Sequence, residues 1–375
     1  YFVAGPRTEE VNPDGKSRVL YFNHRGQVVR DINALGKEIA TEYDGLGRRT
    51  RVTFPEGDSE EYTYDAAGNV SALRKKAKPG SGLSDIVRTF TYDSTWNKVK
   101  TEVDGNGETT TYNYDSTKGN LLSIQRPQIG AQTPTVSYTY NSRGQVLTHT
   151  DESGVVTTFT YGTSKEILLS KAVDDGGLDL TTVYTYDSRG NIASITDPRG
   201  NKETLAYNKR RQLTKRTQPT PFSCETRFTY DSNGNRKKIR RETGDVSNPW
   251  QEVVATYTVE DQLASLKDPS NNSETYVYDD MRRLWKRTDA GGRVTEYLYE
   301  DNSRLWKVID AAANTEQQIA YSDNGVRISV DDASGNTTEE ELDGFDRLKK
   351  RIYEDGSYEQ LTHDANGNVL TFRTR

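Results

Sequence analysis

The sequence predicts an all-β fold in which tandem β-hairpin repeats of about 21 residues form one long, coiled antiparallel sheet, a spiral or barrel-like wall. Three observations predict this fold. A phrase with two aromatic residues recurs through the chain, each copy ends in a turn signature, and the residues between the turns favour strands. We therefore expect residues 1–375 to form a single continuous array, which is part of a longer protein because the pattern runs to both ends.

The recurring phrase is aromatic-x-Tyr-Asp-x-x-Gly-Asn. Its second aromatic position can be followed from Phe22 to His363 through sixteen copies, spaced 21 to 28 residues apart. We expect the residues of this signature to be structural. In the four best copies they are Tyr62, Tyr64, Asp65 and Gly68; Tyr138, Tyr140 and Gly144; Tyr184, Tyr186, Asp187 and Gly190; and Phe228, Tyr230, Asp231 and Gly234.

Each unit is predicted to run strand, turn, strand, turn. Two aromatic residues at alternate positions lie on one face of a strand. In the following Asp-x-x-Gly turn, Asp accepts hydrogen bonds from turn amides, and Gly takes the left-handed conformation next to a bulge. Second turns such as Asp197 to Gly200 repeat this chemistry. Sixteen units give about thirty-two strands and a strip roughly 150 Å long, which twist forces to coil.

The extra residues of the longer units all fall near second turns, so one rim of the sheet is expected to carry variable loops suited to contacts. These insertions cover residues 75–84, 126–134, 174–180, 216–223 and 242–250. The first turns are expected to keep their length, except for one extra residue between Tyr114 and Gly119. Trp96 takes the place of a first-turn glycine, and Arg74 to Lys76 are expected to lie in a solvated loop.

Composition limits the possible functions. Hydrophobic residues make up only 32% of the chain, but 23 Tyr, 9 Phe and 4 Trp with a net charge of −6 indicate a folded chain that buries tyrosine. The mixed charges disfavour a nucleic-acid partner, which requires a basic excess. No apolar run is long enough for a membrane span, and the first residues lack the pattern of a signal peptide.

The residues suggest no catalytic centre, no cofactor site and no metal site. Known nucleotide, hydrolase and zinc-protease motifs are absent, and the three histidines lie far apart in the array. Cys224 is the only cysteine, which excludes an intrachain disulfide and indicates a small buried residue. The turn aspartates could form a calcium-binding ladder, but turn capping explains them without a metal.

Trp285 and Trp306 lie 21 residues apart at equivalent positions in successive units, so we expect them on one face of adjacent hairpins. Two interpretations are open. The pair can be a packing or lining position, or it can form an aromatic stack that binds a sugar or a hydrophobic segment of a cargo.

The aromatic-x-Tyr-Asp-x-x-Gly-Asn phrase, with the Thr-Asp-Pro-x-Gly-Asn stretch from Thr196 to Asn201, resembles the YD repeats of Rhs proteins. Similar repeats occur in Tc-toxin BC components, wall-associated toxin carriers and teneurins. The resemblance spans nearly the whole chain. It implies the wall of a hollow shell that encloses a C-terminal toxin or effector domain, next to further shell and delivery modules, in a secreted or cell-surface protein. The implied host is a bacterium that exports the effector by type VI secretion or another route.

The family's Rhs-core protease segment, toxin and delivery module do not match any of these residues, so the resemblance implies a non-catalytic wall. Two alternatives to a container are a carbohydrate- or cell-surface-binding repeat module and a teneurin-like adhesion domain. Three glycosylation sequons, at Asn69, Asn271 and Asn336, are compatible with an adhesion domain, whereas a lone cysteine fits a bacterial protein better. An enzyme is the least favoured class.

Overall fold

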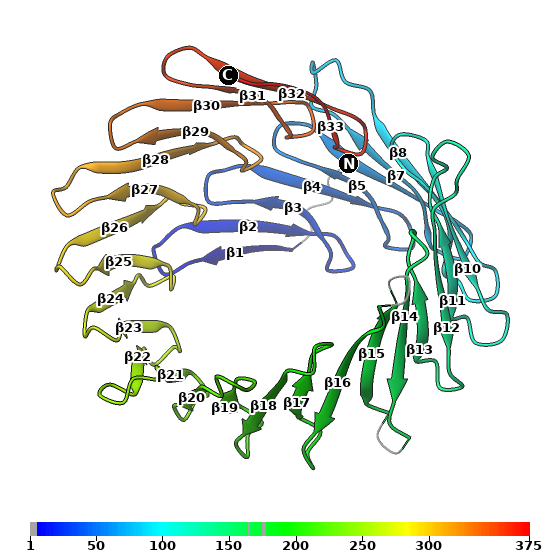
Figure 1. Cartoon of the computed structure of the whole chain (residues 1–375). Helices are drawn as coiled ribbons and strands as arrows, with labels where there is room; N and C mark the ends of the chain where they lie inside the picture. Colours follow the sequence, from blue (N-terminus) through cyan, green and yellow to red (C-terminus); the bar gives the residue numbers. More distant parts are fainter. Residues whose placement is uncertain (1–5, 164–165, 175–177) are drawn as a thin grey trace. The chain divides into compact units, whose positions relative to one another are not determined.

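The computed structural model describes residues 6–163, 166–174 and 178–375. It confirms the all-β prediction: the described residues form 33 strands, which belong to one sheet (Figure 1). The sequence predicted about thirty-two strands. The additional strand is β1 (Arg7–Val11), which pairs with β2 (Ser17–Phe22) before the first copy of the repeat ends.

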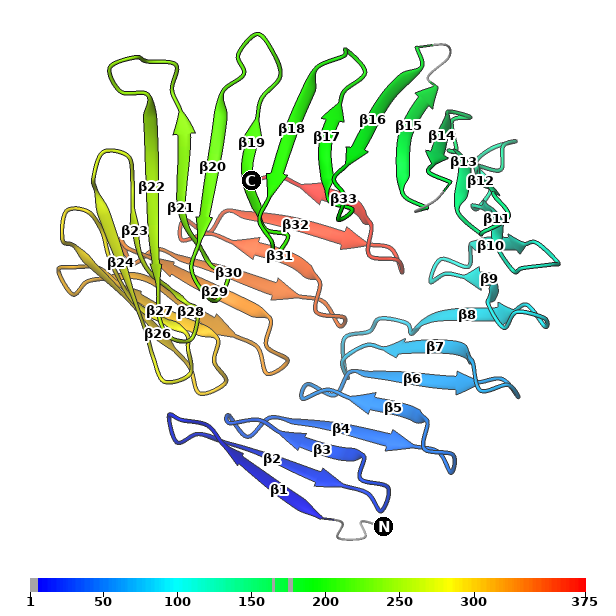
Figure 2. The same cartoon turned by 90° about the horizontal axis from the view of Figure 1, so that it is seen from below.

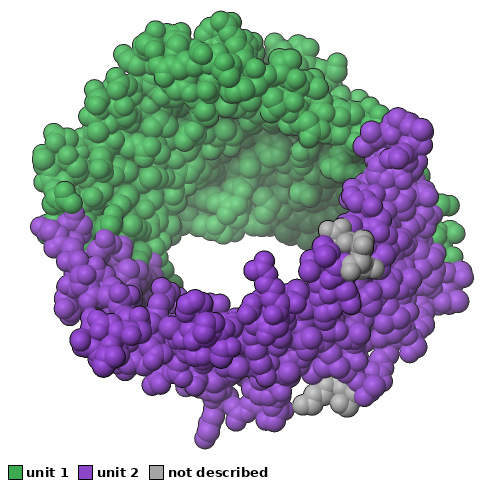
Figure 3. Space-filling model, in the orientation of Figure 1, with its two compact units in different colours: residues 1–110, 277–288, 292–375 green, residues 111–276, 289–291 purple. Residues whose placement is uncertain are grey.

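The chain divides into two compact units, coloured separately in Figure 3. Unit 1 comprises Tyr1–Thr110, Val277–Thr288 and Gly292–Arg375, and unit 2 comprises Thr111–Tyr276 and Asp289–Gly291. In unit 1, the remaining strands of the first stretch are β3 (Val28–Ile32), β4 (Glu38–Tyr43), β5 (Arg49–Thr53), β6 (Ser59–Tyr64), β7 (Val70–Lys76), β8 (Ile86–Tyr92) and β9 (Val99–Val103). The second stretch of unit 1 contains β25 (Leu284–Thr288), β26 (Val294–Tyr299), β27 (Leu305–Ile309), β28 (Thr315–Tyr321), β29 (Arg327–Asp332), β30 (Thr337–Leu342), β31 (Leu348–Ile352), β32 (Tyr358–His363) and β33 (Val369–Arg373).

Unit 2 holds thirteen consecutive strands in the described residues, which lie side by side in Figure 2. They are β11 (Leu121–Gln125), β12 (Thr135–Tyr140), β13 (Val146–Thr150), β14 (Val156–Tyr161), β15 (Leu168–Asp174), β16 (Leu180–Tyr186), β17 (Ile192–Thr196), β18 (Lys202–Tyr207), β19 (Leu213–Thr217), β20 (Glu225–Tyr230), β21 (Arg236–Glu242), β22 (Trp250–Tyr257) and β23 (Leu263–Lys267). The strands β10 (Thr109–Tyr114) and β24 (Ser273–Tyr278) cross the unit boundaries.

Consecutive strands pair antiparallel, and the hairpins closed by first turns contain a β-bulge beside the second aromatic residue. In β16 and β17, Thr185 pairs with Ser194 and Tyr186 pairs with Ile192, so one residue of β17 has no partner. The same shift recurs between Thr139 and Tyr140 and between Thr229 and Tyr230. A bulge increases local twist, so each of these repeats adds twist at its first-turn hairpin.

The first turns have the geometry that Asp-x-x-Gly requires. The Asp187 carboxylate accepts hydrogen bonds from the amides of Arg189 and Asn191, both at 2.9 Å, and from the side chain of Asn191 at 2.8 Å. Gly190 has φ +84°, in the left-handed region that favours glycine. The hydrogen bonds from Asn191 lower the pKa of Asp187, because they stabilise the ionised carboxylate.

Three first turns are longer than this pattern, where the sequence predicted one. In the turn from Asp93 to Lys98, the left-handed residue is Asn97 with φ +52°, so Trp96 does not replace the glycine. The turn after Tyr114 has one extra residue as predicted, with Gly119 at φ +67°, and the turn from Gly162 to Ile167 places Glu166 at φ +55°. In each case the extra residue moves the left-handed position one place further along.

Arg74 to Lys76 are part of strand β7, and the prediction that they form a loop was wrong. Lys75 and Lys76 form ion pairs with Glu60 and Glu61 on the neighbouring strand β6, so cross-strand charge pairs extend this hairpin. The loop begins at Ala77. The other four insertions connect strands at second turns, as predicted, although residues 175–177 of one lie outside the described residues.

Both faces of the sheet are partly exposed. Among the described residues, only six apolar side chains are buried: Leu20, Val52, Val136, Ala255, Val308 and Ile319. One face carries the paired aromatic rings, and the other carries cross-strand hydroxyl pairs such as Thr139 with Thr148 at 2.7 Å. Because this sheet buries little apolar surface, hydrogen bonds and side-chain contacts between neighbouring strands must supply much of its stability. Contacts between repeats are therefore more important here than in a sheet with a buried core.

Candidate functional site

The most extensive long-range contacts of unit 1 join two rims of the sheet. Second turns that follow β1 to β9 meet first turns that follow β24 to β32, at sequence separations of 258 to 286 residues. We call this set of contacts the seam. It includes ion pairs of Lys16 with Asp301 at 3.0 Å and of Lys37 with Asp323 at 2.7 Å. Within unit 1, a rim of the second stretch therefore docks against the opposite rim of the first stretch.

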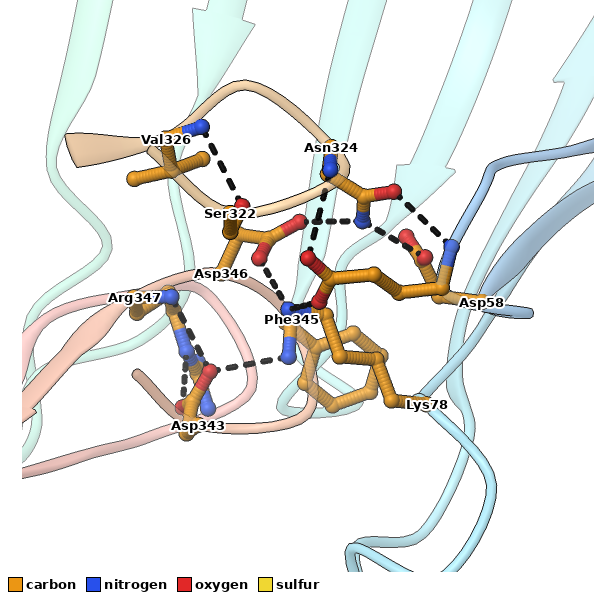
Figure 4. Close-up of polar contacts among 10 residues, drawn as sticks. Asp58, Lys78, Ser322, Asn324, Val326, Asp343, Phe345, Asp346 and Arg347 are labelled. Atoms are coloured by element: carbon orange, nitrogen blue, oxygen red, sulfur yellow. Dashed lines mark hydrogen bonds and ion pairs between the residues drawn. The ribbon is translucent and has the colours of Figure 1, made fainter. Parts of the chain in front are cut away.

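Lys78 lies in one part of the seam, among the polar residues drawn in Figure 4. Its ammonium group forms ion pairs with the carboxylates of Glu56 and Asp346, and its backbone amide donates to the carbonyl of Gly344 at 2.8 Å. The three charged side chains are only 17–22% exposed. Because these charges are largely removed from water, each one depends on the others for compensation.

Asn324 completes this cluster from the opposite rim. Its side-chain amide donates to Asp58 and to Asp346, both at 2.8 Å, and its side-chain oxygen accepts the amide of Glu56 at 3.1 Å (Figure 4). An asparagine provides both donors and an acceptor, so one side chain can connect three groups.

The pKa shifts in the cluster follow from burial and these partners. Burial raises the pKa of Asp58, and the nearby charge of Asp346 adds to the shift. Burial acts against the charged forms of Lys78 and Glu56 as well, but their partners together outweigh it: Asp346 and Glu56 at Lys78, and Lys78 and Asn324 at Glu56. The pKa of Lys78 is therefore raised and that of Glu56 is lowered.

A second part of the seam is a reciprocal contact of two turns. Asn106 donates to Asp364 at 2.8 Å, and Asn366 donates to Asp104 at 2.7 Å. Gly105 lies between them, and a Cβ atom there would come within 2.8 Å of the Ile86 side chain and 3.0 Å of the Ala365 carbonyl. The seam therefore requires glycine at this position because two backbones approach closely.

The signature tyrosines connect neighbouring repeats. The hydroxyl of the second aromatic residue donates to the carbonyl that begins a strand of the preceding hairpin, for example Tyr140 to Leu121 at 2.7 Å and Tyr186 to Leu168 at 2.6 Å. The acceptor lies beside the bulge, where ladder pairing is interrupted. The same contact is made by Tyr43, Tyr64, Tyr92, Tyr161, Tyr230, Tyr257, Tyr299 and Tyr321. We call this series the tyrosine ladder.

Trp285 and Trp306 both line one open pocket of unit 1, with a volume of about 510 Å³. Trp285 is 38% exposed and Trp306 is 41% exposed. The indole of Trp285 donates to Glu296 at 2.7 Å, and the Lys286 ammonium lies 4.0 Å from its ring centre. The two rings thus share a pocket, and a role of this pair in ligand binding remains a prediction.

Two groups of structural residues were not singled out from the sequence. Lys78 lies in an insertion, where no repeat pattern marks it. Arginines at the third position of first turns donate to a carbonyl of the next first turn, as Arg143 does to Thr163 at 3.3 Å and Arg189 to Asn208 at 3.4 Å. The recurrence of Arg at this turn position was the available signal. The described residues contain no cluster of His, Cys, Asp and Glu suited to a metal, and no helix in these ranges could span a membrane.

Comparisons with known proteins agree with this geometry. The teneurin YD-shell family model matches residues 159–336, and the RHS repeat model matches residues 22–59 and 43–78. Double-stranded DNA deaminase toxin A of Burkholderia cenocepacia (strain H111) is 30% identical over 154 residues, which are 41% of this chain and 10% of that protein. The tRNA3(Ser)-specific nuclease WapA of Bacillus spizizenii is 30% identical over 139 residues, 37% of this chain and 5% of that protein.

Solved structures show the same fold at low sequence identity. The crystal structure of TcdB2-TccC3 has a TM-score of 0.62 at 15% identity, and the match covers 97% of this chain and 23% of that one. The Photorhabdus luminescens Tc holotoxin pore has a TM-score of 0.61 at 15% identity, covering 95% of this chain and 23% of that one. The chain thus spans about a quarter of these structures and a tenth or less of the curated relatives.

Proposed function

Because this chain belongs to the Rhs/YD-repeat family, we propose that it is part of the wall of a non-catalytic shell that encloses a C-terminal toxin or effector domain before delivery. In this proposal residues 1–375 act as one continuous array of about sixteen repeats within a longer protein. The partners are the cargo domain and the flanking shell and delivery modules, and the protein is exported by a bacterium. No nucleic acid, cofactor or membrane span is assigned to the array.

The seam is the observation that carries this proposal. A strip whose rim docks onto its own opposite rim forms a wall without a gap between successive turns of chain, as a container requires. The buried Lys78 cluster supports such a wall, because it makes the rim contact specific. The names of two relatives, a deaminase toxin and a tRNA nuclease, support a toxic cargo.

The proposal can be tested by protease protection in the full-length protein. We expect the downstream domain to resist proteolysis in the native protein. In the Lys78→Met variant, which removes a cation of the seam, the same domain should be cut faster. The control is Lys75→Met, because Lys75 forms only an exposed ion pair with Glu60. A downstream domain that is cut equally fast in all three proteins would contradict enclosure.

The exposed tryptophan pocket favours a second candidate function, a carbohydrate- or cell-surface-binding module. Aromatic rings that share an open pocket can stack against sugars. Glycan arrays test this candidate. Binding that is lost in Trp285→Ala and Trp306→Ala, and retained in Trp250→Ala, would support it. Trp250 is a suitable control because its ring is held between Arg227 and Arg240.

A further inference from the structure

Three consecutive first turns of unit 2 carry a concentration of positive charge. These turns follow β16, β18 and β20, and we call them, with the first residues of β21, the basic rim. Its six cations are all exposed: Arg189, Lys209, Arg210, Arg211, Arg236 and Lys237. Residues 202–241 contain twelve Lys and Arg against three Asp and Glu, although the whole chain has a net charge of −6.

Little in the basic rim neutralises these cations. Its two carboxylates, Asp187 and Asp231, cap their own turns, so six cations stand against two carboxylates. Within the described part of the chain, the side chains of Lys209, Arg211 and Lys237 have no hydrogen bond and no ion pair. The basic rim is therefore positively charged and can attract an acidic partner at long range.

A rim of opposite charge exists in unit 1. It consists of the second turns that follow β27, β29 and β31, and we call it the acidic rim. These turns and the residues beside them, 310–316, 331–337 and 353–357, contain six Asp and Glu and no Lys or Arg. The carboxylates of the acidic rim are Asp310, Glu316, Asp331, Asp332, Glu354 and Asp355. Asp355 forms an ion pair with Arg375, but the rim as a whole stays strongly negative.

The two rims match in spacing as well as in charge. Each advances by two strands per turn, so charges recur at about 10 Å on both. The seam also shows how rims of this fold recognise one another, since Lys16, Lys37 and Lys78 bind carboxylates of facing turns.

We propose that two copies of this chain associate, with the acidic rim of one copy docked on the basic rim of the other. The contact is heterologous, because each copy contributes a different surface. It repeats the turn-to-turn recognition of the seam between molecules. It does not depend on the proposed container function.

The test uses two variants of the full chain with complementary defects. The first reverses the basic rim with Lys209→Glu, Arg211→Glu and Lys237→Glu. The second reverses the acidic rim with Glu316→Lys, Ser334→Lys and Glu354→Lys, which leaves every turn-capping aspartate in place. A control carries Lys100→Glu, Lys267→Glu and Lys349→Glu, three exposed cations outside both rims. Circular dichroism checks that all variants are folded.

Sedimentation velocity reports the association. We expect the parent chain and the control to associate at about 0.05 M salt and to dissociate at about 0.5 M salt, because salt screens surface charge. Each rim variant should sediment as a monomer, and an equimolar mixture of the two should associate again, because each variant carries the rim that complements the other. A monomeric parent chain, or a mixture that stays monomeric, would overturn the proposal. So would association of the parent chain that requires added RNA.

Discussion

Removing one hydroxyl from the tyrosine ladder gives a sharp test of how the repeats are joined. Tyr140→Phe keeps the ring but removes the hydrogen bond to the Leu121 carbonyl at 2.7 Å. Burial raises the pKa of Tyr140, with the nearby Tyr138 and Asp115 adding to the shift, so this hydroxyl lies partly out of water. The loss of such a bond costs about 1 kcal/mol, with a range of about 0.5–1.5 kcal/mol.

Hydrogen exchange is the appropriate assay, because repeat arrays open locally rather than in a single step. A cost of about 1 kcal/mol corresponds to about fivefold faster exchange for amides of β11, β12 and β13. The matched control is Tyr138→Phe in the same strand, whose hydroxyl has no hydrogen bond in the described structure. Equal acceleration in the two variants would show that the ladder contact does not stabilise the sheet, and would refute the reasoning.

Three further predictions concern the seam and the turns. Lys78→Met should destabilise the seam by about 1–3 kcal/mol, because it leaves two partly buried carboxylates without a cation. The backbone amide of residue 78, which donates to the Gly344 carbonyl, should therefore exchange faster in this variant than in Lys75→Met. Gly190→Ala should cost about 1 kcal/mol in thermal or denaturant unfolding, because Gly190 has φ +84°, whereas Gly45→Ala should be nearly neutral. The hydrogen bonds from Asn368 and Asn106 lower the pKa of Asp364 to about 2. The ionised carboxylate should therefore stabilise its turn above about pH 4, and this stabilisation should be lost as the pH falls through about 2. Amide exchange measured against pH should show this dependence, and Asp364→Asn should abolish it.

Each of these three expectations has a clear contrary result. Lys78→Met with exchange like that of Lys75→Met would show that the seam is held elsewhere. Equal effects of alanine at Gly190 and Gly45 would show that the left-handed conformation is not the cause. An unchanged pH dependence in Asp364→Asn would assign the titration to another group.

Local turn chemistry explains why the hairpins were predictable. The residues from Asp187 to Asn191 contain everything that their turn needs, namely a carboxylate, two amides and a glycine, so five positions determine the geometry. The longer turn at Asp93 was misread for the same reason. This turn also begins with an aspartate, like the regular first turns. It differs only in the position of its left-handed residue, which is Asn97.

The seam could not be predicted because its partners lie 258 to 286 residues apart, and the repeat period does not indicate which turns meet. Which turns meet depends on the accumulated twist of many strands, a quantity that no short pattern encodes. Lys78 lies in an insertion that was expected to be a variable loop suited to contacts, but no sequence signal identified its partners. The hydroxyl partners of the tyrosines were equally hidden, although the preference for Tyr over Phe was a signal that each ring needs a polar partner.

Electron microscopy of the chain, alone and with its natural downstream residues, tests the central claim most directly. The account predicts a particle with a continuous curved wall, and additional density inside that wall only when the downstream residues are present. A straight ribbon, or a downstream domain that lies outside the wall, would contradict it.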